Sequence, residues 1–160
     1  MISYVFGRRT PLDYANTKLK RFNHLSAKID AAYHDVAMRL GLSDSALRVL
    51  YTLCTCNGEC VLNELVGLCG CGKQTVNSSL RKLEAQGLVR LEALDGRRKK
   101  VCLTGEGETF TNATVRRVIE IENSIFAAWS QAEYDGYLAL TLLVPVCGLW
   151  HFWLRVFYRA

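Results

Sequence analysis

Three side chains between residues 73 and 82 have the chemistry that recognises nucleic-acid bases. Gln74 and Asn77 carry amides, which donate and accept hydrogen bonds together and match the exposed edge of adenine. Arg81 carries a guanidinium, which can bind guanine or a phosphate. Hydroxyl and basic side chains around them suit phosphate positioning. The candidate DNA contacts, including those of a basic segment further along the chain, are Lys73, Gln74, Thr75, Asn77, Ser78, Arg81, Lys82, Arg97, Arg98 and Lys99.

A helix from Lys73 to Gln86 would place the polar side chains of this segment on one face. Val76, Leu80 and Leu83 recur at helical spacing and lie within about 60° of each other at 100° per residue. The side chains with hydrogen-bonding and basic groups fall on the opposite side. The spacing therefore predicts a helix with one buried face and one face free to enter a DNA groove.

The segment after this helix changes to a period of two, which predicts a β-hairpin. Apolar residues alternate from Val89, and Asp95-Gly96 is a strong two-residue turn signal. The basic run 97–100 leaves the turn, and Val101 and Leu103 continue the return strand. An arginine at the tip of such a hairpin can follow the DNA backbone or enter the minor groove, where the negative potential attracts guanidinium groups.

The positive charge of the chain is concentrated in the same segment. The formal net charge is +5, and residues 73–100 hold 8 Lys or Arg against 3 Asp or Glu. This window alone therefore carries a charge equal to that of the whole chain. A polyanion is the natural partner for such a window, and DNA is the first candidate.

Further helices are expected on both sides of the basic segment. An apolar stripe predicts a long helix over 16–40, and Ser43 is the expected N-cap of a second helix that runs to about Thr55. A short helix follows at 63–68. Thr104 is the expected N-cap of a long helix that ends near residue 130.

The overall composition is that of a compact globular chain. Of 160 residues, 50% are hydrophobic and 22% are charged, which excludes a disordered chain. With 12 Gly and 2 Pro, the chain is not collagen-like or of low complexity. The amino terminus has no apolar leader segment, so we expect a cytoplasmic protein whose 7 cysteines are reduced thiols.

Five of the cysteines form two groups, with Cys54, Cys56 and Cys60 in one and Cys69 and Cys71 in the other. A helix of about nine residues between the groups would hold them roughly 13 Å apart, too far for one tetrahedral metal site. We interpret these residues as small apolar side chains of the core. A thiol-based redox or metal sensor that uses Cys54, Cys56 or Cys60 is the alternative.

No arrangement of residues typical of an enzyme is evident in the sequence. It offers no nucleophile–base pair, no paired carboxylates and no phosphate-binding loop. We therefore expect no enzymatic activity, no catalytic residue, no metal and no cofactor.

Four stretches together resemble the MarR family of bacterial transcriptional regulators. They are Asn63–Val66, Lys73–Val89, Asp95–Arg98 and Leu103–Gly107. The resemblance covers about residues 16–140. It implies a homodimer with intertwined N- and C-terminal helices, one winged helix per protomer, and modulation by a small ligand or by thiol oxidation. It also implies that Asp95 orients Arg97 in the wing.

The expected fold class is mainly α with a small β-hairpin (α+β): a winged helix-turn-helix domain with N- and C-terminal dimerisation helices. We assign 16–42 to an N-terminal dimerisation helix and 43–103 to the winged helix DNA-binding region. Residues 104–160 form a long helix and an apolar dimerisation segment. The 18 residues from Tyr137 to Leu154 carry no formal charge. We expect them to lie in the dimer interface rather than touch a membrane.

The expected function is therefore sequence-specific transcriptional regulation by a DNA-binding homodimer. We expect a repressor that binds a pseudo-palindromic operator of double-stranded DNA and responds to a small-molecule effector. The alternative from another class is a winged-helix protein-interaction module whose basic face binds an acidic protein.

Overall fold

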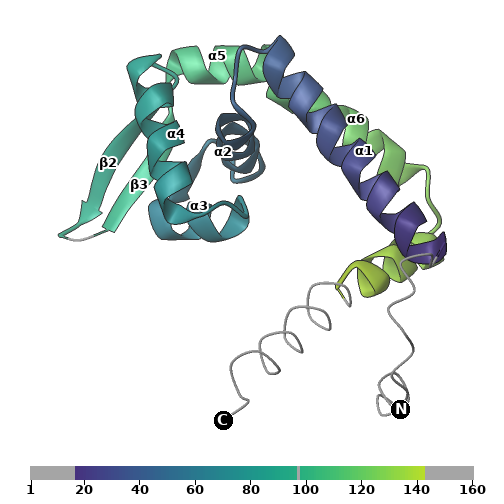
Figure 1. The fold of residues 1–160 in the computed structure, drawn as a ribbon. Helices are drawn as coiled ribbons and strands as arrows, with labels where there is room; N and C mark the ends of the chain where they lie inside the picture. Colours follow the sequence, from purple (N-terminus) through teal and green to yellow (C-terminus); the bar gives the residue numbers. More distant parts are fainter. Residues whose placement is uncertain (1–16, 97, 143–160) are drawn as a thin grey trace, which may run out of the picture. The chain divides into compact units, whose positions relative to one another are not determined.

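The computed structural model describes residues 17–96 and 98–142 (Figure 1). The helices are α1 Thr17–Arg39, α2 Asp44–Thr55, α3 Leu62–Leu68, α4 Lys73–Ala85, α5 Gly105–Ala113 and α6 Val115–Ala127. The strands are β1 Glu59–Val61, β2 Val89–Asp95 and β3 Arg98–Leu103. The chain divides between Gly107 and Glu108 into two compact units. The mainly helical fold with a small antiparallel sheet confirms the expected fold class.

The first two helices begin and end where the sequence predicts. α1 ends before Gly41, whose φ of +68° lies in the left-handed region that favours glycine. Ser43 then caps α2, because its Oγ accepts a hydrogen bond from the backbone N–H of Ala46 at 3.3 Å. Asp44 in the first turn adds a favourable charge at the positive end of the helix.

The core of the first unit forms where α2, α3, α4 and the sheet meet. Leu50, Leu53, Leu65 and Leu83 are fully buried there. α2 packs against both α1 and α4. Gly70, with φ +62°, provides the tight turn between α3 and α4. Figure 1 shows α4 with the β2–β3 hairpin beside it, the arrangement of a winged helix-turn-helix.

The sheet contains one strand more than the sequence predicts. Its order is β1-β3-β2, all antiparallel, and Val101 of β3 lies between Cys60 of β1 and Leu91 of β2. β1 has three residues, too few to show a period of two. The hairpin turn also differs by one residue. Asp95 pairs with Arg98 and therefore belongs to β2, whereas the sequence predicts that it lies in the turn.

The long helix predicted from Thr104 to about residue 130 is wrong in one respect, because it is two helices. α5 and α6 are separated at Thr114, whose φ of −132° and ψ of −84° are not helical. The Thr114 hydroxyl donates a hydrogen bond to the Phe110 carbonyl at 2.6 Å. The predicted cap is confirmed, because Thr104 Oγ1 accepts a hydrogen bond from the N–H of Gly107 at 3.0 Å.

In the second unit, a further helical stretch over 131–142 follows α6. Ser130 and Glu133 form a capping box at its start, with Ser130 N–H donating to the Glu133 carboxylate at 2.8 Å. The ring of Trp129 packs against those of Phe126 and Tyr137, with centroids 5.1 and 5.2 Å away. Within residues 17–96 and 98–142, no helix is both long and apolar enough to span a membrane. The predicted tail beyond residue 142 lies outside the described residues.

Candidate DNA-binding surface

α4 has the two faces that the sequence predicts. Val76, Leu80 and Leu83 are buried, at 2% exposure or less. Every predicted contact on this helix is exposed except Asn77, which is half-buried. The exposed set is Lys73, Gln74, Thr75, Ser78, Arg81 and Lys82. The helix therefore rests on its apolar face and presents hydrogen-bonding and basic groups to solvent.

A serine that the sequence reasoning did not single out fixes α4 to α2. Ser79 is buried, and its hydroxyl donates a hydrogen bond to the hydroxyl of Ser45 at 2.8 Å. Because both groups are partly or fully removed from water, this bond satisfies a polar side chain that would otherwise be costly to bury. It constrains the position of α4 on the rest of the first unit.

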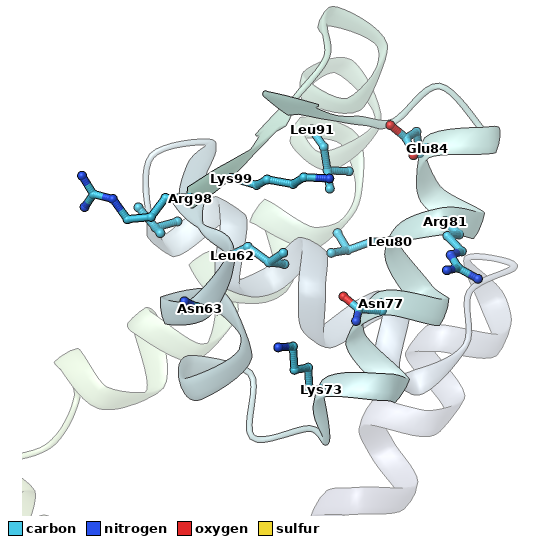
Figure 2. Close-up of a pocket in the computed structure, with 11 residues that line it drawn as sticks. Leu62, Asn63, Lys73, Asn77, Leu80, Arg81, Glu84, Leu91, Arg98 and Lys99 are labelled. Carbon is cyan, nitrogen blue, oxygen red and sulfur yellow. The ribbon is translucent and has the colours of Figure 1, made fainter. Parts of the chain in front are cut away.

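A hollow of about 510 Å³ lies between α3, α4 and the hairpin. Figure 2 shows Lys73, Asn77 and Leu80 on the side of α4 that faces the hollow, while Lys99 extends from β3 toward α4. The hollow is lined by Val61, Leu62, Asn63, Lys73, Asn77, Leu80, Arg81, Glu84, Leu91, Arg98 and Lys99. Four of these residues are cationic and one is acidic, so the hollow favours a negatively charged partner.

Two polar residues of this hollow are absent from the predicted contacts. Asn63 is exposed near the start of α3, and Glu84 is exposed on α4 three residues after Arg81. The spacing of Glu84 from Arg81 places both on one helix face, so helical periodicity could have found it. Only the packing of α3 against the hairpin reveals Asn63, because its own helix is too short to show a periodic face.

The wing aspartate, Asp95, binds an arginine, Arg98, that the family resemblance does not assign to it. Nε of Arg98 donates hydrogen bonds to the two carboxylate oxygens of Asp95 at 2.9 and 3.1 Å, and Arg98 Nη2 contacts the same carboxylate. This hydrogen bonding lowers the pKa of Asp95 and raises that of Arg98. The expected partner, Arg97, lies outside the described residues.

Part of the positive charge in the 73–100 window is neutralised by ion pairs on the sheet. Nζ of Lys100 lies 2.7 Å from a carboxylate oxygen of Glu59 and 3.7 Å from one of Glu92. Nε of Arg90 lies 2.7 Å from Glu92. The hydrogen bond from Arg90 is the main reason that the pKa of Glu92 is lowered. Lys99, which lines the hollow, belongs to none of the ion pairs found within the described residues.

The cysteines have the environment of core side chains. Cys54, Cys60 and Cys69 are buried. Burial, followed by the neighbouring thiol of Cys56, raises the pKa of Cys60 to about 11. The Cys60 thiol is therefore protonated and unreactive at neutral pH.

The predicted separation of roughly 13 Å between the two cysteine groups assumed that one straight helix joins them, whereas Cys60 is in β1. The thiol of Cys69 makes a small electrostatic contribution to the raised pKa of Cys60. Among the described residues, no three His, Cys, Asp or Glu side chains form a group that could hold a metal.

Comparison with known proteins identifies this arrangement. Residues 40–99 match the MarR family. A MarR family transcriptional regulator from Silicibacter pomeroyi is 22% identical with a TM-score of 0.64, covering 82% of this chain and 90% of that one. A MepR–DNA complex from S. aureus is 21% identical with a TM-score of 0.61, covering 80% and 96%. No curated protein matches the chain.

A third solved structure, NadR in complex with 4-hydroxyphenylacetate, is 20% identical with a TM-score of 0.60 and covers 88% of this chain and 97% of that one. At these identities the solved structures establish the fold, and the family match covers the helix-turn-helix and most of the wing. Members of this family are transcriptional regulators and not enzymes, as the sequence predicts. Residues 40–99, which form the helix-turn-helix and most of the wing, thus match the MarR family of transcription regulators, and the solved structures show that the chain shares the fold of that family.

Proposed function

We propose that the protein is a homodimeric repressor that binds a pseudo-palindromic operator in the bacterial cytoplasm. The observation that carries this proposal is the exposed amide and basic face of α4 beside a hollow with four cationic side chains. α4 would enter the major groove, where Gln74, Asn77 and Arg81 read base edges. The other proposed contacts, Lys73, Thr75, Ser78, Lys82, Arg97, Arg98 and Lys99, would bind phosphates or the minor groove.

A second copy of the chain would complete the dimer through the segments 16–42 and 104–160. Phe22, Leu25 and Ile29 on α1 support this assignment, because they are 47 to 55% exposed on one side of the helix. The same holds in the second unit for Ile121 and Ile125 of α6, at 61 and 52%. With one winged helix on each protomer, the half-sites would lie about one helical turn apart.

Selection of binding sites from random duplex DNA tests this proposal. We expect a pseudo-palindromic motif to be enriched, with binding that falls steeply with salt, by a log–log slope of about −0.9 for each phosphate neutralised. Failure to enrich a motif, or binding that is indifferent to salt, would overturn the proposal. That result would favour the alternative, a winged-helix module that binds an acidic protein.

Neighbouring lysines of the wing give a sharper test with a built-in control. Lys99→Ala is expected to weaken operator binding about fivefold and to lower the salt slope by about 0.9, since one phosphate contact is lost. Lys100→Ala should leave the slope unchanged, because Lys100 binds Glu59 and Glu92 instead. Fluorescence anisotropy over a range of salt concentrations measures both. Equal slopes for the two variants would contradict the assignment.

A small molecule would modulate the repressor. NadR was solved in complex with 4-hydroxyphenylacetate, which supports effector binding by this fold. In this chain, a second hollow of about 510 Å³, lined by residues of α1, α2 and α3, offers space for an effector within the first unit. Burial of Cys54 and Cys60 disfavours these two thiols as redox sensors, whereas Cys56, the third thiol of that alternative, is half-buried.

A further inference from the structure

The hollow between α1, α2 and α3, here called the α1–α2 pocket, has an apolar and aromatic lining. Leu47 and Cys69 line it and are buried, with 4 and 5% exposure. Ile29, Tyr33 and Tyr51 complete this part of the lining. A volume of about 510 Å³ is within the range of small-molecule sites, and such a lining suits one aromatic ring.

The charged groups of the α1–α2 pocket are unbalanced toward the negative. They are Asp30 and His34 from α1, and Asp44 and Arg48 from α2. Counted with histidine neutral, two carboxylates face one guanidinium. Nδ1 of His34 lies 2.9 Å from one oxygen of Asp44. Asp30 takes part in none of the ion pairs within the described residues.

These charges disfavour a carboxylate ligand such as the one bound by NadR. An anion in the α1–α2 pocket would gain the attraction of Arg48 but would be repelled by Asp30 and Asp44. A cation would instead be attracted by the two aspartates and repelled by Arg48. It would also be attracted by Tyr33 and Tyr51, because aromatic faces attract ammonium groups. Charge complementarity therefore selects a positively charged aromatic molecule.

We propose that the α1–α2 pocket binds an aromatic amine in its cationic form, with the ring among the apolar side chains and the ammonium at Asp30 and Asp44. The proposal rests on the effector role given to this pocket in the proposed function. The ligand would contact α1 together with α2 and α3 of the helix-turn-helix. Its binding would thereby bias how the DNA-reading helices are held relative to α1.

Three probes of one skeleton test the charge preference directly. Tyramine is a cation, 2-(4-hydroxyphenyl)ethanol is neutral, and 4-hydroxyphenylacetate is an anion, while the ring and chain length are shared. Titration of the full chain without DNA, followed by calorimetry and by the methyl NMR signals of Ile29 and Leu47, measures affinity and location. We expect tyramine to bind about tenfold more tightly than 4-hydroxyphenylacetate, with the neutral alcohol between them.

Matched variants on α1 locate the ammonium. Asp30→Asn should weaken tyramine binding about fivefold and leave binding of the neutral alcohol unchanged. Asp35→Asn, an exposed aspartate on the same helix that does not line the pocket, should change neither. Equal or tighter binding of 4-hydroxyphenylacetate, no binding at millimolar tyramine, or an unchanged tyramine affinity in Asp30→Asn would overturn the proposal. Because DNA is absent, these results are independent of operator binding.

Discussion

Replacing Gly107 with alanine is expected to lower the free energy of unfolding by about 3 kcal/mol. A Cβ at this position would lie 1.9 Å from the backbone oxygen of Leu88 and 2.9 Å from its carbonyl carbon. Both atoms belong to the main chain and cannot rotate away. The clash would force α5 away from the residue that leads into β2, and the hydrogen bond from Gly107 N–H to Thr104 would be strained.

Gly105 is the matched control, two residues earlier in the same helix. An added Cβ there meets no atom within 4 Å, so Gly105→Ala should change stability by no more than about 0.5 kcal/mol. Urea denaturation followed by circular dichroism measures the free energy of unfolding of both variants. The comparison assumes that this free energy depends on urea concentration with the same slope in each. Similar midpoints for Gly107→Ala and the unmodified protein would show that α5 does not pack closely against Leu88.

The helix α4 could be predicted from the sequence, because the pattern that determines it lies within the helix itself. The spacing of Val76, Leu80 and Leu83 determines which face of α4 is buried, and no distant residue is needed to find it. Turn and cap residues such as Gly41, Ser43 and Thr104 mark helix ends for the same reason. The fold class followed from these signals in their order along the chain.

The features that the sequence did not reveal depend on contacts between distant segments. β1 has three residues and becomes a strand only because β3 pairs with it. The break at Thr114 carries no Gly or Pro to mark it. The partner of Lys100 is Glu59, 41 positions away. The positive charge of residues 73–100 could therefore be counted from the sequence, but the sequence did not show which of these charges are neutralised by ion pairs.

The partner of Asp95 shows the same limit on a smaller scale. A register shift between Ala93 and Asp95 places Arg98 directly opposite the aspartate. Family resemblance alone pointed to Arg97. A bulge of this kind cannot be read from the alternation of apolar residues, because it interrupts that alternation. In the described part of the wing, the arginine that Asp95 binds is Arg98.

Replacing Arg81 with alanine is expected to weaken operator binding by about 1–3 kcal/mol, which is roughly 5- to 150-fold. Arg81 is exposed on α4 and lines the hollow beside Asn77 and Glu84. A guanidinium at this place can form two parallel hydrogen bonds to one guanine, and such a pair distinguishes guanine from the other bases. The variant should therefore lose its preference at one base pair of each half-site as well as affinity.

Two further variants separate base reading from simple charge. Arg81→Lys keeps the positive charge but loses the planar pair of donors, so it should recover part of the affinity without the base preference. Lys82→Ala, at the adjacent exposed position, should weaken binding to all sequences alike and lower the salt slope by about 1. Affinities measured on the selected operator and on duplexes altered at single base pairs distinguish these cases. If Arg81→Lys binds with an unchanged base preference, Arg81 contacts a phosphate, and the sequence is read by Gln74 and Asn77 instead.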